Sequence, residues 1–205
     1  MSNYPSISQA IFLWQESLSS ITETAPEQNQ IEYIYHTTGV ADSAYKIAQK
    51  CNLNPYKAYV LGLLHDYGKI QNEKVTGKAH FIVGYDKMIK EGFIDVANVC
   101  LSHSFPIKEF SFNDYASYHI DNLIMAKKLL KEIEYDDYDR LIQLCDIFFE
   151  GMNKISYQKR IERIRKRYNL TKDQTTILEK GSKSNKEYFD SRCGCNVYDI
   201  LNIRD

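Results

Sequence analysis

The chain has few of the residues that make turns, and it has no long apolar stretch. Glycine (9) and proline (4) are scarce among its 205 residues, which argues against a turn-rich all-β protein. No apolar run approaches the ~20 residues needed to span a bilayer, so we expect no membrane partner. Residues 1–45 contain no lysine or arginine, whereas a secretory signal begins with basic residues. We therefore expect a soluble, cytoplasmic protein.

A charge excess of either sign is also missing. The 26 basic and 27 acidic residues leave a net charge of −1, which argues against a dedicated nucleic-acid binder. The balance conceals one basic segment, because residues 151–180 contain nine lysines and arginines. The five cysteines are odd in number and follow no framework, a pattern typical of a reducing compartment.

Helix-capping signals recur along the chain and predict an all-α fold. Asn54 and Pro55 have the residue types preferred at N-cap and N1. Thr171 and Gln174 have the spacing of a capping box. Gly92 is placed to end a helix that begins near residue 80. No alternating strand pattern longer than a few residues is present, so we expect roughly eight to ten helices of ordinary length.

These elements predict one domain over residues 1–205. We expect a core over about 30–150 and an accessory amphipathic helix over 1–25. Basic helices and a polar tail should make up residues 151–205. The tail from Lys180 onward is rich in polar residues, and we expect it to be mobile.

Several histidines and aspartates lie on the apolar faces of different helices. In a helix, residues three and four apart share a face. His36 precedes Val40 by four residues on an apolar stripe, and His103 extends a stripe that contains Val96 and Cys100.

The acidic residues follow the same pattern. The uncharged segment 58–64 runs directly into His65 and Asp66, and Asp146 lies within the stripe of the helix expected before residue 151. His80 stands where another helix begins. A buried carboxylate is costly unless it is paired or bound to metal.

Each of these residues alone is compatible with a hydrogen-bonded core position or a helix cap. Together they predict a metal site, because helix bundles build such sites from imidazole and carboxylate ligands on facing helices.

The order His36, His65-Asp66, Asp146 resembles the HD-domain superfamily of metal-dependent phosphohydrolases, and the segment 64–69 resembles its H-D-x-G-K signature. The resemblance implies a compact multi-helix bundle with a central metal site. It implies His36, His65, Asp66 and Asp146 as ligands of a first ion. It also implies His80 and His103, with Asp66 as a bridge, as ligands of a second ion. One or two divalent ions of Fe, Mn, Ni, Co or Zn would suit these ligands.

The branch resembled most is the small bacterial one that acts on dinucleoside polyphosphates and related nucleotides. The cyclic-dinucleotide phosphodiesterase branch carries a G-Y-P element that is missing here. The nucleotidase branch places an acid three residues after the H-D pair, where this chain has Lys69.

The function predicted is metal-assisted hydrolysis of a phosphate ester or anhydride in a small substrate, with a nucleotide favoured. Asp66, Lys69 and Asp146 are the candidate catalytic residues. Lys69 is a candidate phosphate clamp, although a solvated lysine near a helix end is the alternative. Thr37, Arg160 and Arg163 are weaker candidates for substrate binding, against the alternatives of an exposed helical threonine and a solvated basic helix.

Two other functions stay open: a di-iron oxygenase with the same ligands, and a non-catalytic regulatory module that binds a nucleotide or RNA. The sequence leaves the oligomeric state open as well.

Overall fold

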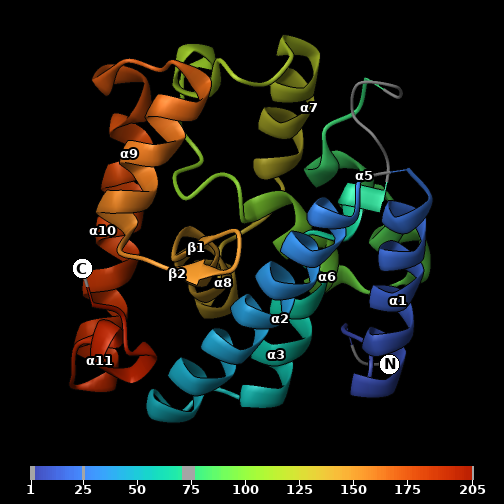
Figure 1. Cartoon of the computed structure of the whole chain (residues 1–205), viewed down its shortest axis with the longest axis horizontal. Coiled ribbons are helices and arrows are strands. Elements are labelled where there is room, and N and C mark those ends of the chain that lie inside the picture. The colour runs from blue at the N-terminus through green and yellow to red at the C-terminus, as the bar shows by residue number, and fades with distance from the viewer. Residues whose placement is uncertain (1–2, 25, 71–76, 205) are drawn as a thin grey trace.

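The computed structural model describes residues 3–24, 26–70 and 77–204. Over these residues the fold is all-α, as predicted, with ten α-helices and a single two-stranded hairpin (Figure 1). The helices are α1 (Ile7–Thr24), α2 (Glu27–Lys50), α3 (Pro55–Leu64), α5 (His80–Glu91), α6 (Ile94–Ser102), α7 (Ile120–Leu130), α8 (Asp137–Ile147), α9 (Tyr157–Tyr168), α10 (Lys172–Cys193) and α11 (Val197–Leu201). Two short 3₁₀ helices, η1 (Tyr67–Ile70) and η2 (Phe112–Tyr115), and the strands β1 (Phe149–Glu150) and β2 (Asn153–Lys154) complete the list.

The predicted caps lie where the sequence placed them. The Asn54 side chain accepts hydrogen bonds from the backbone N–H groups of Tyr56 and Lys57 at the start of α3. Thr171 and Gln174 form a capping box at the start of α10. Gly92 ends α5 with a φ of 79°, a left-handed conformation that glycine adopts without strain.

The centre of the molecule is the pair α2 and α3, which run side by side (Figure 1). Helix α3 has no charged residue after Lys57, so it can be buried on nearly all sides. Gly62 allows its backbone to approach α2, because a Cβ at this position would lie 2.8 Å from the Cα of Ala41. The C-terminal end of α3 therefore delivers His65 and Asp66 into the interior, where both are about 1% exposed.

The remaining helices surround this pair. Helix α1 packs on α3 and η1 at one edge of the view in Figure 1, and α9, α10 and α11 lie at the opposite edge. Helix α10 packs on α8, which carries Asp146. None of the helices described in the structure is long and apolar enough to cross a membrane.

One expectation about the C-terminal part is wrong. Residues beyond Lys180 do not form a mobile tail but continue α10 to Cys193. The face of this helix that meets the rest of the domain contains Ser182, Asn185 and Phe189, all of which are buried. The single large apolar side chain among polar neighbours gave too weak a period to predict a packed helix.

Candidate metal centre

The structure brings all six predicted ligands into one place, from five different parts of the chain. His36 comes from the middle of α2, and His65 and Asp66 directly follow α3. His80 is the first residue of α5, and His103 caps the C-terminal end of α6. Asp146 lies in the last turn of α8. The ends of buried helices therefore supply most of the site.

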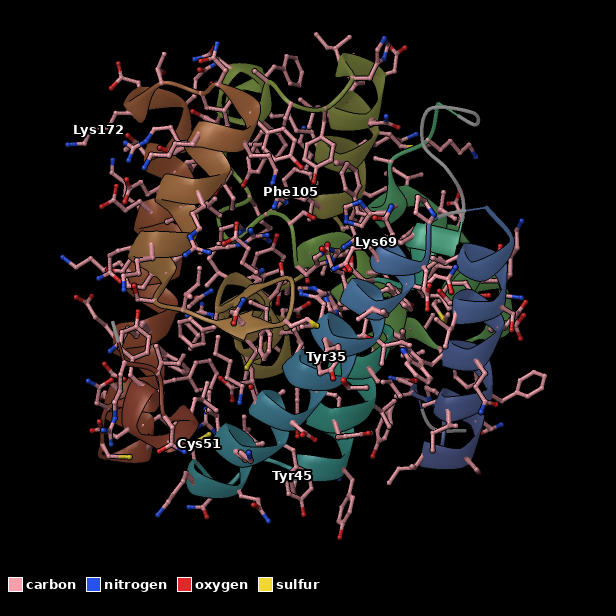
Figure 2. All side chains as sticks on the ribbon, viewed as in Figure 1. Tyr35, Tyr45, Cys51, Lys69, Phe105 and Lys172 are labelled. Carbon is pink, nitrogen blue, oxygen red and sulfur yellow. The ribbon has the colours of Figure 1, made fainter. Side chains whose placement is uncertain are left out.

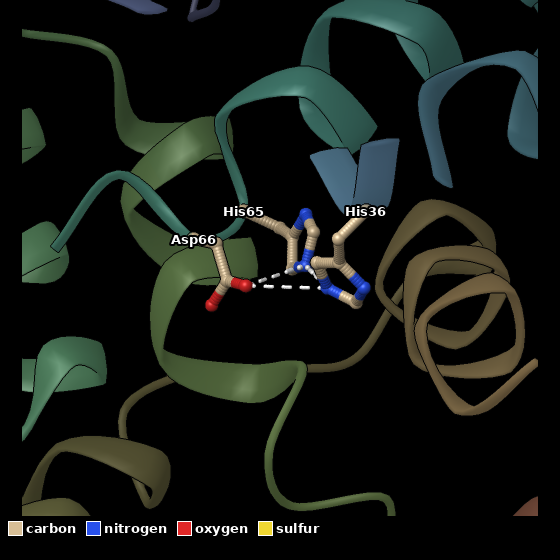
Figure 3. Close-up of side chains that lie close together, drawn as sticks. All are labelled: His36, His65 and Asp66. Carbon is tan, nitrogen blue, oxygen red and sulfur yellow. Dashed lines mark hydrogen bonds and ion pairs between the residues drawn. The ribbon is translucent and has the colours of Figure 1, made fainter. Parts of the chain in front are cut away.

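His36, His65 and Asp66 form a first group (Figure 3). The Nε2 atoms of His36 and His65 are 3.1 Å apart, and they lie 3.2 Å and 3.4 Å from Oδ2 of Asp66. Asp146 joins this group, since its Oδ1 lies 3.0 Å from His36 Nε2 and 3.6 Å from His65 Nε2.

His80 and His103 form a second group on the other side of the same carboxylate. Their Nε2 atoms are 3.1 Å apart, and each lies 3.5 Å from Oδ1 of Asp66. The two oxygens of Asp66 thus face two different pairs of histidines. Oδ1 is buried and has no hydrogen-bond partner among the described residues, and a buried carboxylate oxygen without a partner is costly.

These distances fit divalent transition metals. Nitrogen and oxygen ligands lie about 2.0–2.2 Å from such an ion, so that neighbouring ligand atoms are roughly 3–3.6 Å apart. Nδ1 of His65 lies 2.7 Å from the carbonyl oxygen of Gly62, and Nδ1 of His103 lies 3.1 Å from that of Val99. Because a carbonyl oxygen only accepts, Nδ1 carries a proton in both rings, and Nε2 is the atom that each neutral ring would offer to an ion.

The electrostatics of the second group favour a cation. Burial lowers the pKa of His80 to about 3 and that of His103 to about 4, so both rings are neutral near pH 7. Neutral imidazole is the form that binds metal. The Nε2 atoms of the two rings and Oδ1 of Asp66 face one another here, and the Ser104 hydroxyl lies 3.2 Å from Nε2 of His103. An ion among them would bind two neutral nitrogens and the unpartnered carboxylate oxygen.

The first group shows the opposite behaviour in the absence of an ion. Burial opposes a charge on His65, but Asp66 and Asp146 outweigh it and raise the pKa of His65 to about 10. Burial also opposes a charge on Asp66, but Lys69 and His65 hold its pKa well below the usual value. Without an ion, the positive charge of protonated His65 therefore stabilises the two carboxylates.

Lys69 reaches the same carboxylate from η1. Its Nζ contacts Oδ2 of Asp66, three residues earlier, while the side chain stays 45% exposed. Figure 2 shows Lys69 near the middle of the molecule, far from Tyr45 on α2 and from Cys51, which follows the end of α2. The structure thus places a half-exposed positive charge at the edge of the centre.

A cavity of about 710 Å³ opens onto this centre. His36, Asp66, Lys69, His80, His103 and Asp146 all line it, whereas His65 lies behind them. Other walls come from η2, α9 and α10. The volume lies in the range of small-molecule sites, about 300–1,000 Å³, so the cavity is much larger than a phosphate group needs.

Thr37 does not reach the cavity, which corrects the expectation that it contacts the substrate. The residue is fully buried. Its hydroxyl donates to the backbone oxygen of Tyr33 at 2.8 Å and accepts from the indole nitrogen of Trp14 at 2.9 Å. Thr37 therefore ties α1 to α2, next to His36.

The two candidate arginines of α9 differ in their position relative to the cavity. Arg160 lines the cavity, and Arg163 does not. Both contact the carboxylate of Glu150 on β1. Of the two, only Arg160 stays a candidate for substrate binding.

Sequence reasoning missed a buried polar network beside the centre. Gln143 donates to the backbone oxygen of Ser102 at 3.0 Å and accepts from Asn185 at 2.9 Å. Ser102 donates to Asp139 at 2.6 Å. Gln143 is one turn before Asp146, and Ser102 precedes His103. Gln143 precedes Asp146 by three residues, so the sequence could have shown that both lie on the same face of the helix. No local pattern in the sequence connects Asn185 to Gln143.

Gly68 has a steric role. A Cβ at this position would lie 1.8 Å from the backbone oxygen of His80 and 2.7 Å from the nitrogen of Gly84. The missing side chain therefore lets η1 approach α5, and this brings Asp66 within reach of His80.

Comparison with known proteins supplies a family match over the central part of the chain. The sequence model of the HD domain matches residues 33–149, which is more than half of the 205 residues. All six predicted ligands lie in that range, whereas α1, α9 and α10 lie outside it. No curated protein and no solved structure matches the chain.

Proposed function

The chain belongs to the HD domain family, and from that premise we propose that it is a metal-dependent hydrolase of a small phosphorylated substrate. One observation carries the proposal. The two oxygens of Asp66 face two separate pairs of histidines, and Lys69 contacts the same carboxylate at the end of a cavity.

The residues fit one or two divalent ions. His36, His65, Asp66 and Asp146 would hold the first, and Asp66, His80 and His103 would hold the second. Ions held there supply Lewis-acid chemistry, which withdraws charge from a phosphoryl oxygen and lowers the pKa of a water molecule. The unpartnered Oδ1 of Asp66 is the feature of this chain that supports the second group most directly.

The chain's own groups have separate tasks. Lys69 has an exposed stem and an ammonium group that can leave Asp66 for a phosphoryl oxygen, to which it would donate hydrogen bonds. Asp146 is 28% exposed at its side chain and lines the cavity, so its carboxylate can accept a hydrogen bond from a water molecule beside the phosphate and orient it. His65 is shielded behind the others and acts only as a ligand.

Within this class we propose a nucleotide as the substrate. Tyr118 lines the cavity with its ring centroid 6.4 Å from that of His80. Tyr168 lines the cavity as well. Aromatic rings in the wall of this cavity would provide surfaces on which a planar base can stack.

The test is a screen of phosphomonoesters, phosphodiesters and nucleotides, with protein loaded separately with Mn, Fe, Co, Ni or Zn. We expect metal-dependent phosphate release, and we expect Asp66→Ala to lower it by more than about a hundredfold. Asp121→Ala is the matched control, because Asp121 is an acid whose side chain is 81% exposed, and it does not line the cavity. Phosphate release by Asp66→Ala at the wild-type rate would contradict the proposal. Oxygen uptake by iron-loaded protein without phosphate release would identify an oxygenase instead.

A further inference from the structure

Three arginines of α9 converge on one carboxylate at the side of the cavity. Arg160, Arg163 and Arg167 are spaced three and four residues apart, so they share one face of the helix. Arg160 Nη1 and Arg167 Nη2 lie 3.4 Å and 3.6 Å from Oε1 of Glu150, and Arg163 contacts Oε2. One carboxylate cannot neutralise three guanidinium groups, so this arginine cluster keeps an excess of positive charge.

Arg160 is the member of the cluster that lines the cavity. Its side chain is 19% exposed, whereas those of Arg163 and Arg167 are 50% and 57% exposed. Its contact with Glu150 is longer than the 2.7–3.2 Å of a well-formed N–H···O bond. A guanidinium group has five N–H donors, and the contact of Arg160 with Glu150 is made by Nη1. Arg160 therefore keeps donors available to a ligand, while Arg163 makes the shortest contact with Glu150.

The η2 side of the cavity has the opposite charge. Asp114 also lines the cavity, and its Oδ2 is held by the backbone N–H of Ser111 at 2.6 Å. An anionic group of the substrate would be repelled there and attracted to α9. The charges in the cavity therefore define one place for a second anion besides the metal centre.

We propose that Arg160 forms a second anion subsite, so that the substrate is a phosphate ester carrying a second anionic group. The inference rests on the proposed function, because the scissile phosphate occupies the centre around Asp66 while the second group binds Arg160. The subsite lies on α9, outside the region matched by the HD domain. It is thus a feature of this chain's own C-terminal segment.

The experiment measures dissociation constants by calorimetry for Mn-loaded protein and stable phosphonates. Alkylphosphonates with three to eight carbons serve as ligands with one anionic group. The α,ω-bisphosphonates and ω-phosphonocarboxylates of the same lengths serve as ligands with two anionic groups. Because the series covers several chain lengths, the distance between the metal centre and Arg160 need not be assumed. We expect at least one ligand with two anionic groups to bind on the order of tenfold more tightly than its alkylphosphonate counterpart.

Variants locate the effect. Arg160→Gln should abolish the preference for the second anionic group without changing the affinity for alkylphosphonates, and Arg160→Lys should keep part of it. Arg163→Gln is the matched control from the same cluster and should keep the full preference. The inference is overturned if no length shows a preference, or if Arg160→Gln keeps it. Failure of the proposed function looks different, because wild-type protein would then release no phosphate from any ester in the screen.

Discussion

Asn185 donates a hydrogen bond from its Nδ2 to the Oε1 of Gln143, at 2.9 Å, and so joins α10 to α8 one turn before Asp146. Gln143 in turn donates a hydrogen bond to the backbone oxygen of Ser102, which precedes His103. The two helices that position the predicted ligands His103 and Asp146 are therefore braced by a third helix, which lies outside the region matched by the HD domain. Because Asn185 and Gln143 are each about 5% exposed, loss of either partner leaves a buried polar group unsatisfied.

Replacing Asn185 by alanine should lower the free energy of unfolding by about 1–3 kcal/mol, the cost of an unpaired buried polar group. Ser184→Ala is the matched control on the exposed side of the same helix, and its effect should stay within about 0.5 kcal/mol. Urea denaturation followed by circular dichroism measures both. Equal stabilities of the two variants would show that the bond between α10 and α8 contributes nothing.

Gly68→Ala should destabilise the protein by about 1–3 kcal/mol or more, because the new methyl group would collide with backbone atoms of α5 that cannot move alone. The same collision should displace His80 from Asp66 and weaken metal binding. Gly77→Ala is the control: Gly77 has a φ of 69° but open space around its Cβ position. We expect it to cost about 1 kcal/mol, with metal binding unchanged. A Gly68→Ala protein with wild-type metal affinity would refute the steric role.

Asp139 should make stability depend on pH. Burial raises its pKa to about 6, although Ser102 and the backbone of Asp136 donate hydrogen bonds to it. For a carboxyl whose pKa is raised in the folded state, the contribution to stability is complete below the ordinary value near 3.8 and is lost as pH rises through about 6. Asp139→Asn should therefore gain about 2 kcal/mol relative to wild type between pH 4 and pH 7.

Metal-free protein is the sample for this measurement, with unfolding free energies determined at several pH values. His80 and His103 have lowered pKa values, so they make stability fall as pH drops below about 6.5. Their contribution is the same in both proteins and cancels in the difference. A difference that does not change with pH would show that Asp139 titrates normally.

The sequence predicted those parts of the structure that depend on local chemistry. Asn54, Thr171 and Gly92 act on neighbouring backbone groups, so the ends of their helices could be read directly. His36 and His103 could be recognised because a polar side chain on an apolar stripe is visible in the sequence. The all-α fold followed from the caps, and the metal site was predicted from the polar residues on apolar faces. The family followed from the resemblance of the ordered histidines and aspartates and of segment 64–69 to the HD-domain pattern.

The rest depends on contacts between residues that are distant in the chain. Thr37 looked like an exposed helical threonine because its partner, Trp14, lies 23 residues away. The course of α10 depends on packing of Phe189 and Asn185 against elements that local periodicity does not reveal. Arg160 and Arg163 share a helix face, and only the three-dimensional path of β1 and α9 decides which one lines the cavity.

The most direct test of the account is the number of transition-metal ions bound per chain, measured by mass spectrometry after loading and desalting. If Asp66 serves both groups, His80→Ala should lose the second ion and keep the first, whereas Asp66→Ala should lose both. His119→Ala is the control, since His119 is exposed at the start of α7, and it should bind as much metal as the wild type. Circular dichroism confirms that each variant is folded. An Asp66→Ala protein that is folded and binds as much metal as His80→Ala would contradict the account.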